Sequence, residues 1–149
     1  ANGKRTAVIK HHGHESPIAL PRPETDSMQL FAAGAASSLV YGDGMVQLHM
    51  KSGEPPRFSH LLSMASLSNP DILFIEGFKE LLYPKVVLVR TAEDWEELRH
   101  LSAIVCVVAQ KGTQLVDTEV IPRDDTEALV RWLNQWMEVT GHEAIRDRD

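Results

Sequence analysis

The chain has 149 residues, 43% hydrophobic and 24% charged, which is ordinary for a globular protein. Its net charge of −6 argues against nucleic-acid binding, and it has no run of about 18 apolar residues that could cross a membrane. The length favours one domain, which we place at residues 1–140, before a charged tail at 141–149. Cys106 is the single cysteine, so no internal disulfide can form and a reducing cytoplasm is expected.

The first third of the chain predicts a strand, a loop and a helix. The strand covers residues 6–10, and three prolines between 17 and 23 predict an extended loop after it. Apolar residues at helical spacing predict a helix at 26–35, with Asp26 as its N-cap and Gln29 three positions later.

The next segment predicts an antiparallel hairpin and a second helix. Strands at 38–41 and 45–50 flank the turn Gly42-Asp43-Gly44, and alternation in the second strand indicates one wet face. Such a hairpin leaves an exposed edge that commonly pairs with another chain. A helix is predicted at 57–67.

The C-terminal half predicts strands alternating with helices. The predicted strands are 72–76, 85–89, 104–109 and the short 119–121. Each of the first three contains at least four consecutive apolar residues, as in a parallel sheet buried on both faces. Thr91 caps a short helix, and Asp124 with Glu127 caps a longer one carrying Trp132 and Trp136. The fold class is therefore α/β: a mostly parallel sheet flanked by helices, with an added antiparallel hairpin.

Glu76 is the first candidate functional residue, because it ends an apolar strand and is followed by Gly77. Ligands bind beyond the carboxyl ends of strands in open α/β sheets, and P-loop proteins hold Mg²⁺ near a carboxylate in such a place. The alternative is a solvated acid paired with Lys79. The segment alone leaves both interpretations open.

Two further polar groups lie in loops or at element ends. Lys10-His11-His12-Gly13-His14 follows the first predicted strand, and the histidines suggest a transition-metal site as a minority hypothesis. Asp26-Ser27 precedes the helix that ends in Ala33-Gly34-Ala35. Taken alone, Asp26 is better explained as a helix cap than as a ligand.

In order and spacing, these groups resemble the MobB family, which acts in making the guanine dinucleotide form of the molybdenum cofactor. The resemblance is carried by Val8 to His14, by Asp26-Ser27 before the Ala-Gly-Ala helix end, and by Ile75 to Lys79. It covers residues 3 to about 95.

The resemblance implies a P-loop-NTPase-like fold that binds GTP with Mg²⁺ and has at most weak GTPase activity. It also implies a homodimer formed through the extra strands, and a partner enzyme that joins GMP to molybdopterin. By the same resemblance, Glu76 and Asp26 would be the catalytic acids and Mg²⁺ ligands. The nucleotide- and phosphate-binding residues would be Lys10, His11, His12, His14, Gly77 and Lys79.

The sequence departs from the P-loop pattern in one respect. A phosphate loop requires Gly-x-x-x-x-Gly-Lys-Ser/Thr, and Gly3-Lys4-Arg5-Thr6 does not satisfy it. We expect a truncated sequence, with a first strand, phosphate loop and first helix of about 25–30 residues upstream. The alternatives are a non-catalytic adaptor for the nucleotidyl-transferring partner and a histidine-loop metal-binding protein. No base-reading motif distinguishes GTP from ATP.

Overall fold

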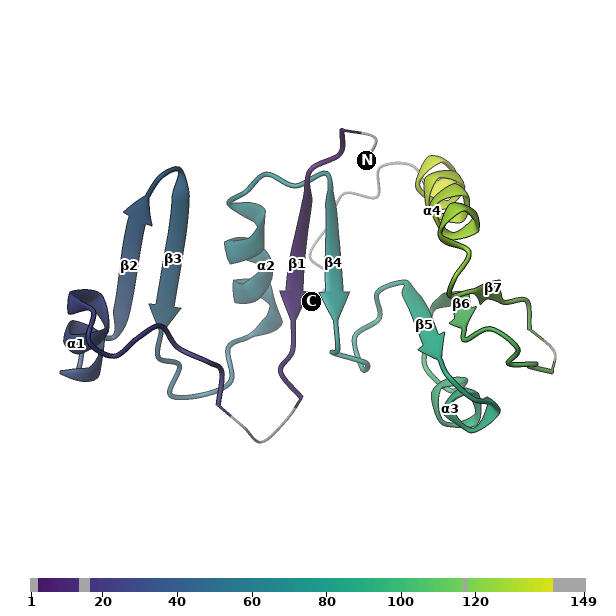
Figure 1. The fold of residues 1–149 in the computed structure, drawn as a ribbon, viewed down its shortest axis with the longest axis horizontal. Helices are drawn as coiled ribbons and strands as arrows, with labels where there is room; N and C mark the ends of the chain where they lie inside the picture. The colour runs from purple at the N-terminus through teal and green to yellow at the C-terminus, as the bar shows by residue number, and fades with distance from the viewer. Residues whose placement is uncertain (1–2, 14–16, 117, 141–149) are drawn as a thin grey trace. The chain divides into compact units, whose positions relative to one another are not determined.

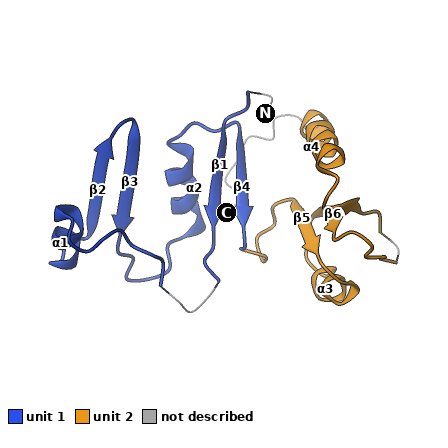
Figure 2. Ribbon diagram, in the orientation of Figure 1, with its two compact units in different colours: residues 1–77 blue, residues 78–149 orange. Residues whose placement is uncertain are grey.

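A computed structural model of the chain describes residues 3–13, 17–116 and 118–140. These residues form two compact units, 1–77 and 78–149 (Figure 2), each of which is described by itself. The single domain expected at 1–140 stays a prediction, and the expected tail at 141–149 lies outside the described residues. Within the described ranges, no helix is long and apolar enough to cross a membrane.

Strands β1 (Thr6–Lys10) and β4 (Ile72–Glu76) form a two-stranded parallel sheet in the first unit (Figure 1). Both strands form where the sequence predicts them. Helix α2 (Phe58–Ser66) packs against β1. Ile9 and Leu62 are buried here. The two strands run in the same direction, so their carboxyl ends lie together at one edge.

The rest of the first unit is a helix packed against a hairpin. Helix α1 (Asp26–Ala32) contacts β2 (Ser37–Gly42), which pairs with β3 (Met45–Met50) in the predicted antiparallel hairpin. Phe31 of α1 is buried, and the Lys51 ammonium lies 4.7 Å from its ring centroid. The prediction of one wet face was wrong, because apolar side chains on both faces of the hairpin are exposed.

Helix α1 also corrects two details of the sequence prediction. It ends at Ala32 rather than at Ala35, and Gly34 takes a φ of +119°, which is incompatible with a continuing helix. Its N-cap is Thr25, not Asp26, which occupies the first helical position. Neighbouring threonine and aspartate are both good cap residues, so composition alone does not choose between them.

The sheet of the second unit has three parallel strands in its described residues: β5 (Lys85–Val89), β6 (Ile104–Ala109) and β7 (Ile121–Pro122). Helix α3 (Ala92–Leu98) contributes Trp95 and Leu98 to a core built on alternate residues of β5 and β6. Cys106 is buried as predicted, and this burial raises the pKa of its thiol. The last strand begins two residues later than expected.

The helix caps of the second unit confirm one prediction and correct another. Thr91 caps α3, since its hydroxyl accepts the Asp94 N–H at 3.3 Å. For α4 (Thr126–Thr140), the Ala128 N–H donates to Asp125 Oδ1 at 2.8 Å, so the capping acid is Asp125 rather than Asp124. The indole rings of Trp132 and Trp136 stack with centroids 6.1 Å apart on the half-buried side of α4.

The predicted burial on both faces was wrong for β4 and β5, although parallel pairing and the α/β class are confirmed. Phe74 of β4 is 43% exposed and Leu88 of β5 is 64% exposed. Successive strand residues point to opposite faces, and the described strands form three small sheets rather than one. In β1, which contacts α2, and in β5, which contacts α3, one set of alternate residues is more buried than the other.

Candidate functional site

Lys10 and Glu76 form the polar centre of the β1–β4 edge. The parallel register places them opposite each other as the last residues of their strands. Lys10 Nζ lies 2.7 Å from Glu76 Oε1, with side chains that are 59% and 63% exposed. The carboxylate expected at a strand end is therefore present and ion-paired, and its partner is Lys10 instead of the alternative Lys79.

Gly77 allows the ends of the two strands to approach each other closely. The His11 N–H donates to the Glu76 carbonyl at 2.9 Å, which continues the ladder beyond the strands. Gly77 has a φ of +84°, and a Cβ built there would lie 2.8 Å from the His11 Cβ. Both the backbone conformation and the close approach therefore require glycine. Phe78 follows with a φ of +51°, so the chain turns sharply after the acid.

Four of the predicted site residues therefore come together at this edge: Lys10, His11, Glu76 and Gly77. His12 is exposed in the loop after β1, and His14 lies outside the described residues. Asp26 is exposed on α1, which packs against β2, and within the described part of the chain no hydrogen bond or ion pair joins it to Glu76. Lys79 is exposed in the second unit.

The edge fits a Mg²⁺ ion held mainly by a nucleotide and water. Mg²⁺ in such sites usually takes one or two protein carboxylates together with substrate phosphates, and Glu76 offers one exposed carboxylate. Among the residues that the structure describes, no three His, Cys, Asp or Glu side chains are grouped to enclose a metal. The histidine-loop metal site stays a hypothesis, because His14 is not described.

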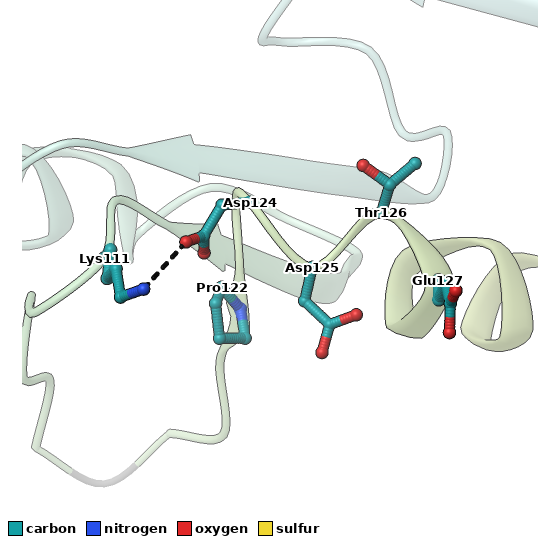
Figure 3. Close-up of a pocket in the computed structure, with 6 residues that line it drawn as sticks. All are labelled: Lys111, Pro122, Asp124, Asp125, Thr126 and Glu127. Atoms are coloured by element: carbon teal, nitrogen blue, oxygen red, sulfur yellow. Dashed lines mark ion pairs between the residues drawn. The ribbon is translucent and has the colours of Figure 1, made fainter.

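An open hollow of about 520 Å³ lies at the start of α4 in the second unit (Figure 3). It is lined by Lys111, Pro122, Asp124, Asp125, Thr126 and Glu127. Lys111 Nζ lies 3.2 Å from Asp124 Oδ2, and Asp125 caps the helix. Sequence reasoning missed this hollow because no motif connects the loops after β6 and β7 that form it.

The β2–β3 hairpin presents the main apolar surface of the first unit. Its exposed apolar side chains are Leu39, Val40, Tyr41, Met45, Val46, Leu48 and Met50. An isolated two-stranded hairpin is only marginally stable in water. By the strand register, Leu39, Tyr41, Val46, Leu48 and Met50 share one face, and Val40 and Met45 lie on the other. Exposed apolar surface of this kind is typical of an interface with another chain.

Comparison with known families and proteins agrees with the resemblance found in the sequence. The family model described as molybdopterin guanine dinucleotide synthesis protein B (MobB) matches residues 1–110. The probable molybdopterin-guanine dinucleotide biosynthesis adapter protein of Bacillus subtilis (strain 168) is 30% identical over 120 residues, which are 80% of this chain and 68% of the relative. The corresponding adapter protein of Escherichia coli (strain K12) is 29% identical over 145 residues, covering 93% of this chain and 79% of the relative.

Solved structures show the same similarity. The crystal structure of a MobB protein homolog from Bacillus stearothermophilus superposes with a TM-score of 0.70 at 29% identity, and the match covers 93% of this chain and 81% of that one. The crystal structure of Bacillus subtilis MobB gives a TM-score of 0.70 at 29% identity over 90% of this chain and 81% of that one.

Proposed function

This chain belongs to the MobB family, and on that premise we propose that it is a GTP-binding adapter in the biosynthesis of molybdopterin guanine dinucleotide. In this role it assists the enzyme that joins GMP to molybdopterin, and any GTP hydrolysis of its own is slow. The family match and the names of the relatives support the pathway. We assign the protein to the cytoplasm, on the basis of its single buried cysteine.

The observation that carries the nucleotide part of the proposal is the Lys10–Glu76 pair at the carboxyl edge of β1 and β4. Glu76 would hold Mg²⁺ directly or through water, and the ion would neutralise developing phosphate charge. Lys10 would bind the phosphate oxygens, with His11 and His12 as neighbouring donors. Gly77 would keep the backbone after Glu76 close to His11. Asp26, His14 and Lys79 complete the proposed set.

The test is calorimetric titration of Mg²⁺–GTP and Mg²⁺–ATP into this chain and into a form extended upstream to any in-frame start codon. We expect at least one form to bind Mg²⁺–GTP, with Glu76→Gln weakening binding about tenfold or more. Glu96→Gln is the matched control, because Glu96 is also an exposed acid, 3.0 Å from Arg99. Absence of nucleotide binding by both forms would refute the proposal.

A non-catalytic adaptor is the second candidate, favoured because Glu76 already has a cationic partner. An adaptor would contact the nucleotidyl-transferring enzyme without using nucleotide itself. Retention of the partner enzyme in a nucleotide-free pull-down by both Glu76→Ala and Asp26→Ala would favour this function. Failure of the wild-type chain to retain the partner enzyme without nucleotide would count against it.

We also propose that the chain forms a homodimer through the β2–β3 hairpin, whose apolar side chains are exposed. Val46→Asp places a charge on this surface and should convert the dimer to a monomer in light-scattering measurements. Leu67→Asp is the control, since Leu67 is exposed on the same unit but beyond the end of α2. A wild-type chain that is monomeric, or a Val46→Asp variant that stays dimeric, would contradict this interface.

A further inference from the structure

The Lys10–Glu76 contact occupies the carboxylate that a metal ion would need. Lys10 Nζ lies 2.7 Å from Glu76 Oε1, which is within the range of a short charge-assisted hydrogen bond. Building on the proposed function, we propose that Lys10 is the counter-ion of Glu76 before nucleotide binds and changes its partner when nucleotide binds. It holds Glu76 while the site is empty, then releases it to the divalent cation and turns to the phosphate oxygens of the nucleotide.

The pair is suited to exchange because it is exposed and therefore weak. More than half of each side chain is accessible to water. Exposed ion pairs of this kind shift an equilibrium constant by about fivefold or less, so a divalent cation can compete with the ammonium for the same oxygen. Lysine is also a compact point charge with three donors on a flexible stem, which allows it to change acceptors.

The backbone beneath the pair is held in place independently of the two charges. The His11 N–H donates to the Glu76 carbonyl at 2.9 Å, and Gly77 lies against the His11 side chain. The ladder of β1 and β4 continues behind these residues. The exchange therefore requires only side-chain rotation, and both groups start it from the end of a fixed strand.

A second ion pair, just before the start of the same two strands, provides a matched control. Arg5 Nε lies 3.8 Å from Asp71 Oδ2, and each of these residues directly precedes its strand. Arg5 and Lys10 are five residue steps apart along the chain, which is about 17 Å at the usual rise per residue. This exceeds the screening length of about 8 Å at physiological salt, so the Arg5 charge should not influence an ion at Glu76.

The exchange predicts effects of opposite sign for a single substitution. Lys10→Met removes the competitor for the carboxylate, so a divalent ion alone should bind about two- to fivefold more tightly. The same change removes a phosphate contact, so the complex of the ion with GTP should bind more weakly, by about tenfold. A lysine that only pairs with Glu76 for stability would not produce the second effect, and one that only binds phosphate would not produce the first.

The experiment titrates Mn²⁺, alone and then with GTP, into the wild-type chain, Lys10→Met and Arg5→Met. Broadening of the Gly77 amide signal in NMR spectra reports Mn²⁺ bound at Glu76. The Lys10 side-chain signal is followed in a parallel titration with diamagnetic Mg²⁺, because Mn²⁺ would broaden it beyond detection. The upstream-extended form is used for the GTP titrations. Because Lys10 is exposed, the substitution should not unfold the chain, and Lys10→Gln repeats the measurement with a different side chain.

The expected result is tighter Mn²⁺ binding by Lys10→Met and Lys10→Gln, weaker Mn²⁺–GTP binding by both, and no change in Arg5→Met. Unchanged or weaker Mn²⁺ binding by the Lys10 variants overturns the exchange. If wild-type protein binds Mn²⁺–GTP and the Lys10 variants bind it equally well, the exchange fails while the proposed nucleotide function stands. If no form binds Mn²⁺–GTP, both fail together.

Discussion

Gly77→Ala tests whether the close packing of the two strand ends holds the site together. Alanine at a φ of +84° costs about 1–2 kcal/mol for the left-handed backbone alone. The new Cβ would also lie 2.8 Å from the His11 Cβ, and relieving such overpacking typically costs a further 1–3 kcal/mol. We therefore expect the free energy of unfolding to fall by about 2–5 kcal/mol, with displacement of His11 from the Glu76 carbonyl.

Chemical denaturation of a double-mutant cycle separates the two contributions. Gly112 has a φ of +86° and no atom within 4 Å of a built Cβ, so Gly112→Ala should cost only the backbone part. In a His11→Gly background the clash is absent, and Gly77→Ala should then cost about as much as Gly112→Ala. Equal losses from Gly77→Ala with and without the His11 side chain would refute the steric explanation.

Two further predictions concern the cores and the ion pairs of the units. Leu62→Ala should lower the free energy of unfolding by about 2–5 kcal/mol, because the Leu62 side chain of α2 is buried and α2 packs against β1. Leu67 is exposed just beyond the end of α2, so Leu67→Ala should change the free energy of unfolding by less than about 0.5 kcal/mol. Urea denaturation measures both values. The hydrogen bonds that Arg90 donates lower the pKa of Asp94 from 3.8 to about 2. This pair therefore stabilises the fold above about pH 4, and its contribution is lost as the pH falls through about 2. Carboxyl ¹³C shifts measured against pH should show this value in the wild type and a higher pKa, still below 3.8, in Arg90→Met, because the backbone N–H of residue 90 still donates to the Asp94 carboxylate. The same low value in both would contradict the assignment.

Local signals in the sequence predicted the secondary structure well where one residue type dominated. The strand at 6–10 was predicted correctly, and the hairpin was predicted in the right place, because β-branched runs and glycine act through neighbouring backbone. Its turn is Asp43-Gly44, since Gly42 still belongs to β2. The cap positions were wrong by one residue at Asp26 and at Asp124, since an equally good cap residue is adjacent in each case. Burial on both faces of β4 was wrong because apolar composition does not say which face a helix covers.

The sequence by itself determined the α/β class, the strand that ends in Glu76-Gly77 and the resemblance to the MobB family, because these depend on residue types at short spacing. Only the tertiary structure decided that Lys10 is the partner of Glu76, since the two residues are 66 positions apart and meet through the parallel register of β1 and β4. It also decided that Gly77 lies against His11, while Asp26 sits on a helix packed against the hairpin. Contacts between distant segments depend on strand register and on which helix covers which face, and neither is encoded in any single stretch of sequence.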